Sequence, residues 1–209
     1  MRGLIIALLM SVGLADTIQW RVDSSNATRA QESSREQYDL RISHTGSGDS
    51  LITIKTRYCK GTQTKCGTQS KTNAQGVEIF NAFYRNGAYE GVVKEYYDKG
   101  AIKSETPFKA GKREGEFKSY YENGALKMSQ LYMNHKREGE GKKYYPNGVL
   151  QESYTYANDK REGVRREFDK QGKLMYETMY KADKKQWMKR YDSSGRLLEE
   201  KSCLWQSCY

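Results

Sequence analysis

The cysteines are the residues whose spacing most directly suggests covalent or metal chemistry. The chain of 209 residues has four, in two close pairs, Cys59 with Cys66 and Cys203 with Cys208. In an oxidising compartment each pair is expected to close a small loop, although four cysteines allow three connectivities and a bridge between the pairs stays open. Zinc is the alternative, but separations of seven and five residues are not finger spacings. We expect disulfides, and no metal or other cofactor.

The two histidines are the other side chains that commonly do chemistry near neutral pH. His44 lies in a stretch rich in Gly and Ser, and His135 stands where parallel segments have Gly or Asp. Neither has a nucleophile or carboxylate placed beside it by a recognisable motif. We therefore expect no catalytic residues and a protein that is not an enzyme.

Charged residues recur in register rather than in a catalytic cluster. The tetrapeptide Lys-Arg-Glu-Gly occurs three times, each copy 24 residues after the last, at 112–115, 136–139 and 160–163. Its arginines, Arg113, Arg137 and Arg161, are expected along one edge of a sheet about 10 Å apart. Such a row could contact an acidic protein surface or lipid phosphates. The alternative is that these charged turns only keep the chain soluble.

Aromatic pairs recur with the same period, each before a turn that contains glycine. The clearest pairs are Tyr96-Tyr97, Tyr120-Tyr121 and Tyr144-Tyr145, and degenerate copies follow at Phe168-Asp169 and Tyr191-Asp192. The Asn-Gly turns at 123–124 and 147–148 favour two-residue type I′ turns, since both positions need a positive φ. Each unit is therefore predicted to be one β-hairpin, with successive hairpins side by side in an antiparallel meander.

Strand alternation assigns the aromatic side chains to the two faces of this sheet. A two-residue turn at 123–124 places Tyr121 opposite Leu126 and Ser119 opposite Met128, with Phe117 on the same face. The two candidate binding surfaces are then the second aromatics, Tyr97, Tyr121 and Tyr145, and on the other face the first aromatics, Tyr96, Tyr120 and Tyr144. The alternative is that these rings only hold neighbouring hairpins together.

The N-terminus has the features of a secretory signal. Arg2 is followed by an apolar run from Leu4 to Leu14, and small residues precede a cleavage position at Ala15. About eleven apolar residues rise only about 16 Å as a helix, well short of the roughly 30 Å hydrocarbon layer, which disfavours a membrane anchor. We expect cleavage near Ala15 and a mature protein in the periplasm.

The remaining chain divides by composition. Four segments are expected: a signal peptide at 1–15, an N-terminal β region with a flexible Ser-rich segment at 16–75, hairpin repeats at 76–195, and a C-terminal cap with a cysteine pair at 196–209. Strand candidates in the N-terminal region are Ile18 to Val22, Tyr38 to Ile42 and Leu51 to Tyr58.

The charge balance favours acidic partners. The formal net charge is +10, but 26 acidic residues are interleaved with the 36 basic ones, so much of this charge is expected on a solvated face. The export signal expected at the N-terminus argues against nucleic acid as the partner, so no nucleic acid is expected.

The order Glu-Gly, aromatic pair, Asn-Gly, aliphatic residue, aromatic and Gly-Lys resembles the MORN repeat family, in the bacterial variant with a period near 24, from about Gly76 to Gly195. The resemblance implies an all-β fold, an antiparallel meander of hairpins that forms an elongated curved single sheet, and a binding role. Exported proteins of this variant are similar to immunity proteins, which protect a cell from an antibacterial effector in the periplasm.

The resulting hypothesis is an exported, non-catalytic protein that binds and neutralises a protein toxin or effector by occluding its active site, with a lipase-type effector as one candidate. The alternative is an envelope protein that binds anionic lipid or a membrane surface. The effector's chemistry, the binding face and the oligomeric state stay open.

Overall fold

The computed structural model of the chain describes residues 17–18, 38–204 and 207–208. Its strands are β1 (Thr17–Ile18), β2 (Tyr38–Thr45), β3 (Ile52–Cys59), β4 (Lys65–Thr72), β5 (Glu78–Arg85), β6 (Ala88–Tyr89), β7 (Gly91–Tyr96), β8 (Ile102–Lys109), β9 (Lys112–Arg113), β10 (Gly115–Tyr120), β11 (Leu126–Met133), β12 (Lys136–Tyr144), β13 (Leu150–Ala157), β14 (Lys160–Phe168), β15 (Leu174–Lys181), β16 (Lys184–Tyr191), β17 (Leu197–Leu204) and β18 (Ser207–Cys208). One short 3₁₀ turn, η1 (Gly48–Ser50), is the sole helical element of these residues.

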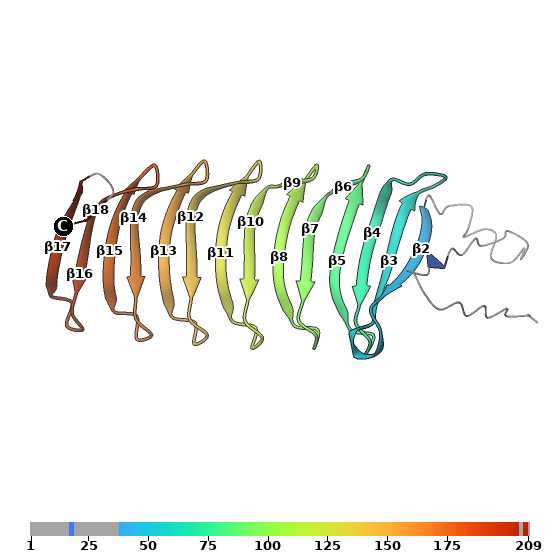
Figure 1. Ribbon diagram of the computed structural model, residues 1–209, viewed down its shortest axis with the longest axis horizontal. Helices are drawn as coiled ribbons and strands as arrows, with labels where there is room; N and C mark the ends of the chain where they lie inside the picture. The colour runs from blue at the N-terminus through green and yellow to red at the C-terminus, as the bar shows by residue number, and fades with distance from the viewer. Residues whose placement is uncertain (1–16, 19–37, 205–206, 209) are drawn as a thin grey trace, which may run out of the picture.

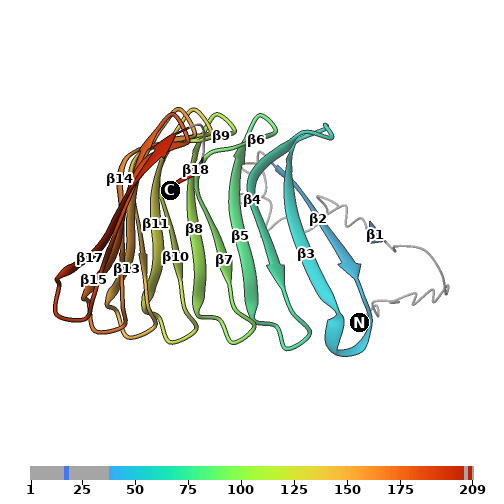
Figure 2. The same ribbon diagram turned by 60° about the vertical axis from the view of Figure 1, so that its left-hand side comes forward.

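The strands from β2 to β17 form one open antiparallel sheet in which neighbours in sequence are neighbours in space (Figure 1). The short strands β6 and β9 pair only with the preceding strand, so β5 also pairs with β7, and β8 with β10. Figure 2 shows that this row of strands is curved. The predicted all-β meander of hairpins in a single curved sheet is confirmed. No helix long and apolar enough to span a bilayer occurs in the described part of the chain.

The Asn-Gly turns at 123–124 and 147–148 are not the two-residue type I′ turns that the sequence predicts. Gly124 donates its N–H to the Tyr121 carbonyl at 2.9 Å, and Tyr121 donates to Ala125 at 2.9 Å. Gly124 has φ 82°, whereas Asn123 is not among the residues with positive φ. This pattern is a type I turn followed by a left-handed glycine. The Asn123 side chain favours it, because its Oδ1 accepts the Ala125 N–H at 3.0 Å.

Type I′ turns instead join the opposite ends of the strands. Asn134 and His135 have φ 50° and 73°, and Asn158 and Asp159 have φ 51° and 68°. Ala182 and Asp183 repeat the pattern at 49° and 70° although neither is glycine. Such turns match the twist of the strands they connect, but Ala and Asp adopt them only at a cost in backbone strain.

The three-residue loop at 122–124 shifts the pairing register between β10 and β11. Ser119 lies opposite Met128, as predicted, but Leu126 lies opposite Tyr120 rather than Tyr121, and the ladder is irregular between Ser119 and Tyr120. By alternation, Phe117, Ser119, Met128 and Gln130 share one face, called here the Gln130 face. Lys118, Tyr120 and Leu131 share the other, called the Tyr120 face.

The 24-residue spacing of glycines with positive φ extends to the N-terminal side of residue 76. Glycines with positive φ recur every 24 residues at Gly67, Gly91, Gly115, Gly139 and Gly163. The strand β4, which the sequence did not predict, pairs with β5 across the Gly76 turn. The N-terminal β region is therefore continuous with the repeats. The signal peptide at 1–15, the Ser-rich stretch and residues 19–22 of the first strand candidate lie outside the described residues.

The sheet has little apolar core. Within the described part of the chain, one buried cluster of Ala82, Tyr84 and Val93 packs against Phe80, Tyr89 and Phe108. The buried residues elsewhere in the described chain include polar side chains such as Gln130 and Thr178. Contacts between adjacent hairpins, rather than a second layer, must therefore hold this sheet together.

Replacing Ala182 with glycine tests the strain of the type I′ turn. Glycine removes the Cβ penalty at φ 49°, so thermal unfolding should show a net stabilisation of about 0.5–1 kcal/mol. The matched control is Ala157→Gly at the end of β13, where φ is not positive and glycine should destabilise by about 0.5–1 kcal/mol. Equal destabilisation by both changes would contradict the assigned turn.

Candidate functional site

The glutamate of each Lys-Arg-Glu-Gly copy binds the type I′ turn of the following unit. Glu114 Oε2 accepts the Asn134 N–H at 2.7 Å, and Glu138 Oε2 accepts the Asn158 N–H at 2.8 Å. Glu162 accepts the Ala182 N–H at 2.8 Å in the same way. Each bond joins residues 20 positions apart and satisfies a backbone donor at the strained turn. We call this contact the clasp.

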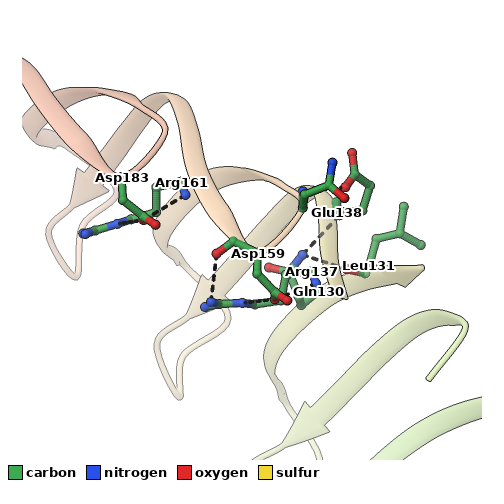
Figure 3. A network of polar contacts seen from close by, with 8 residues as sticks. Gln130, Leu131, Arg137, Glu138, Asp159, Arg161 and Asp183 are labelled. Atoms are coloured by element: carbon green, nitrogen blue, oxygen red, sulfur yellow. Dashed lines mark hydrogen bonds and ion pairs between the residues drawn. The ribbon is translucent and has the colours of Figure 1, made fainter. Parts of the chain in front are cut away.

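The arginine beside the glutamate reinforces the clasp. Asp159 Oδ1 accepts hydrogen bonds from Arg137 N at 2.9 Å and from Arg137 Nε at 3.1 Å (Figure 3). The guanidinium also lies 4.0 Å from the centroid of the Tyr156 ring. Arg161 Nε donates to Asp183 Oδ1 at 3.0 Å, and the Arg161 guanidinium lies 4.3 Å from the centroid of the Tyr180 ring. These two predicted binding residues therefore hold adjacent hairpins together.

Arg113 is the exception in this row. His135 occupies the place of Asp159 and Asp183, and its Nδ1 accepts only the Arg113 backbone N–H at 3.2 Å. The guanidinium lies 5.3 Å from the Tyr132 ring centroid, and it has no carboxylate within ion-pair distance among the described residues. Arg113 thus keeps an uncompensated charge.

The second aromatics connect one repeat to the next. The Tyr97 hydroxyl donates to the Tyr120 carbonyl at 2.7 Å, and the Tyr121 hydroxyl donates to Tyr144 at 2.7 Å. Tyr145 donates to Phe168 at 2.9 Å, which completes the series. These three candidate binding residues are staples between hairpins, the alternative role considered for them.

The first aromatics are partly buried on the Tyr120 face. The Tyr120 hydroxyl donates to Glu105 Oε2 at 2.9 Å, and burial together with this carboxylate raises the pKa of Tyr120. Burial also raises the pKa of Tyr96, with a smaller contribution from the charge of Glu78. Tyr144 is the third member of this row. These rings are accessible in part, so they remain available at the edge of a docking surface.

Polar groups fill the centre of the Gln130 face. Gln130 is 1% exposed, and its Nε2 donates to the carbonyls of Leu131 and Glu138 at 2.9 and 3.2 Å, bridging an irregular part of the ladder between β11 and β12 (Figure 3). A Cβ at Gly141 would lie 2.3 Å from Cε2 of the Tyr154 ring, so glycine permits the close packing there. This part of the face is closed to a ligand.

Glu152 is a buried carboxylate beside this region, and it is paired with two cations. Its Oε2 lies 2.8 Å from Lys143 Nζ, and its Oε1 lies 2.5 Å from Arg165 Nε. Burial alone would raise the pKa of Glu152, but the hydrogen bonds from Lys143 and Arg165 outweigh it and hold the pKa below its ordinary value. The carboxylate therefore stays ionised and is a structural group.

Exposed apolar side chains occupy the Tyr120 face. Phe83, Val92 and Leu131 are 38%, 45% and 36% exposed. Val92 lies opposite Pro107, and Leu131 lies opposite Glu116, in one cross-strand row. Sequence reasoning missed this row because its members fall between the Lys- and Glu-rich positions. The alternation of strand faces was the signal that could have found it.

The cysteines are arranged as disulfides. Cys59 and Cys66 are bonded, with their Cα atoms 5.0 Å apart, and they close the connection between β3 and β4. Cys203 is disulfide-bonded and lies opposite Cys208 in the pair of β17 with β18. No group of three or more potential metal ligands occurs within the described ranges.

A family profile described as the MORN repeat variant matches four consecutive segments, at residues 89–110, 113–134, 137–158 and 161–182. No sequence among curated proteins matches the chain. The matched segments carry the clasp glutamates and the tyrosine staples, so the repeated motif encodes the contacts between hairpins. MORN repeats are generally protein- or membrane-binding modules.

Removing one staple hydroxyl tests this structural role. Tyr121→Phe leaves the Tyr144 carbonyl without its partner and should destabilise the protein by about 1 kcal/mol in thermal unfolding. Tyr132→Phe is the matched control, because its ring packs on Phe117 while its hydroxyl has no hydrogen bond within the described residues. Equal stability of the two variants would contradict the staple.

Acid should weaken the arginine–aspartate pairs that reinforce the clasps. The backbone N–H of Arg137 and then its guanidinium lower the pKa of Asp159, and Arg161 acts alike on Asp183. A carboxylate with a lowered folded-state pKa contributes stability that is fully present above its unfolded pKa and is lost as the pH falls through the folded value. With ordinary values of 3.8 for Asp and 4.5 for Glu152, the urea midpoint should fall as the pH drops from 5 to 3.

The double variant Asp159→Asn with Asp183→Asn is the control for this titration. It should be less stable than the parent at pH 6 and should lose less stability on acidification. Parallel pH profiles for the parent and the variant would show that these carboxylates are not the groups concerned.

Proposed function

We propose that the sheet containing the four MORN repeats at 89–182 is the docking surface of an exported, non-catalytic protein that binds and neutralises an antibacterial toxin in the periplasm. The observation that carries this proposal is the exposed apolar row of Phe83, Val92 and Leu131 on the Tyr120 face. Clusters of exposed apolar side chains on a rigid surface are typical of protein interfaces.

The charges around this row favour a protein partner over a lipid surface. Lys118 and Lys142 lie 3.0 Å from Glu116 and Glu140, and Lys94 lies 3.3 Å from Glu105. Anionic lipid attracts clusters of unpaired basic residues, whereas these lysines are already neutralised by neighbours. Mixed, paired charge around apolar groups instead resembles the rim of a protein interface. Lipid binding remains the alternative function.

Two further features support a neutralising role. The clasps and staples preorganise the sheet, so little conformational entropy is lost when a partner binds. The N-terminal signal expected from the sequence would place such a surface in the periplasm, where an exported immunity protein meets its target. A surface of this kind would act by covering the active site of the toxin, without chemistry of its own.

Protection of bacteria tests the function directly. Cells that direct a panel of antibacterial toxins, lipases among them, to the periplasm should survive one of these toxins when they express the full chain. Deleting residues 1–15 should abolish that protection while the protein remains folded. Undiminished protection without these residues would contradict a periplasmic role, and flotation of the protein with anionic vesicles in place of toxin binding would favour the alternative.

A charge within the apolar row should remove binding. Leu131→Glu should weaken the affinity for the toxin at least about tenfold, since it places a desolvated charge in the interface. Leu198→Glu is the matched control, because Leu198 is 45% exposed but lies in β17, outside the repeats. Titration calorimetry measures both variants, and equal affinities would place the interface elsewhere.

A further inference from the structure

A hollow of ≈ 320 Å³ lies on the Gln130 face, opposite the apolar row. It is lined by Ser104 and Thr106 of β8 and by Phe117 and Ser119 of β10. The side chain of Tyr97, whose hydroxyl donates to the Tyr120 carbonyl, forms one of its walls. Ser104 lies opposite both Glu95 and Ser119, so the hollow spans three adjacent strands. It is thus a recess in the ladder itself and not a gap between loops.

The hollow exists because this unit has small side chains where later units have large ones. One period of 24 residues beyond Ser104 and Thr106 stand Met128 and the buried Gln130, and one period further stand Glu152 and Tyr154. In those units the Gln130 amide, the Tyr154 ring and the Glu152 ion pairs fill the same place. The repeat therefore departs from its own pattern at one unit, which opens a recess on an otherwise filled face.

The cations at this hollow have no ion-pair partners among the described residues. Lys103 and Lys127 lie 5.9 and 5.5 Å from the centroids of the Tyr97 and Tyr121 rings, and neither has an ion pair within the described residues. Arg113 joins them at the hollow, since His135 replaces the aspartate that pairs with the equivalent arginine of later units.

One carboxylate also lines the hollow. Glu95 accepts a hydrogen bond from the Ser104 hydroxyl at 3.1 Å and retains its other oxygen for a second donor. Three positive side chains against one carboxylate leave the site with a net positive charge. An anion that also carries N–H donors would complement both kinds of group.

We propose that this hollow binds an acidic peptide segment of a partner protein. Its carboxylates would contact Lys103, Lys127 and Arg113, a backbone N–H would donate to Glu95, and a side chain would enter the recess beside Phe117. A peptide fits better than a phosphate group alone, because phosphate offers Glu95 no N–H donor. The inference rests on the proposed function only in requiring a protein partner, and it adds a second site on the opposite face.

A fluorescein-labelled hexaglutamate peptide is the probe for this site, measured by anisotropy at low ionic strength because salt screens exposed charges. The double variant Lys103→Ala with Lys127→Ala should weaken its binding roughly tenfold. The matched control, Lys118→Ala with Lys142→Ala, removes two lysines from the Tyr120 face and should leave binding unchanged. Hexalysine should not bind. Equal loss in both double variants would overturn the proposal, since it would show nonspecific attraction.

His135→Asp separates the binding role from a structural one. It gives Arg113 the carboxylate that Asp159 gives Arg137, so the clasp should become more stable while the affinity for hexaglutamate falls several-fold. A merely structural Arg113 would gain stability with unchanged affinity, which would overturn the proposal. The toxin assay keeps the two hypotheses apart. Full toxin binding by the Lys103 and Lys127 double variant alongside lost hexaglutamate binding supports a separate second site. Failure of hexaglutamate to bind the parent overturns this inference and leaves the proposed function standing.

Discussion

The fold depends on the hydrogen bond between a clasp glutamate and the turn of the next hairpin. A single-layer sheet cannot bury enough apolar surface to stabilise itself through a core, as the few buried apolar residues show. Glu114, Glu138 and Glu162 each reach across to a strained type I′ turn and satisfy its backbone N–H. The stability of the sheet is therefore a sum of contacts between neighbours, as in other repeat proteins.

This dependence explains what happens where the repeat degenerates. Asp169 stands in place of a staple tyrosine and uses its carboxylate within its own turn, accepting the N–H groups of Gln171 and Lys173 at 2.9 and 2.8 Å. Asp192 does the same two strands later, and the Ser194 hydroxyl and turn N–H bonds lower its pKa to about 2. The terminal units thus exchange contacts with a next hairpin for local turn stability. The central units keep the hydrogen bonds to the next hairpin, and these bonds hold the sheet rigid.

Periodicity predicted the meander, the pairing of Ser119 with Met128 and the order of the strands. It wrongly assigned type I′ turns to 123–124 and 147–148, because Asn-Gly also fits a three-residue loop. It did not predict the type I′ turn at Ala182 and Asp183, because these residues adopt positive φ without any glycine. The roles of Arg137 and Tyr121 could not be derived, since both act through a partner one period away whose register depends on the bulge beside Tyr120. The hollow could not be predicted either, because it forms where small side chains replace the large ones that fill the same place in later repeats.

The clasp glutamates and staple tyrosines recur from repeat to repeat in this chain, so recognition is left to the positions that differ between repeats. On the Tyr120 face these are the exposed apolar residues, and on the Gln130 face they are the small side chains and unpaired cations around Ser104. Amide hydrogen exchange on the intact protein tests the central claim most directly. The N–H groups of Asn134, Asn158 and Ala182 should exchange far more slowly than that of Glu122, a turn amide without a carboxylate partner among the described residues. Exchange of the three clasp amides as fast as that of Glu122 would contradict the account.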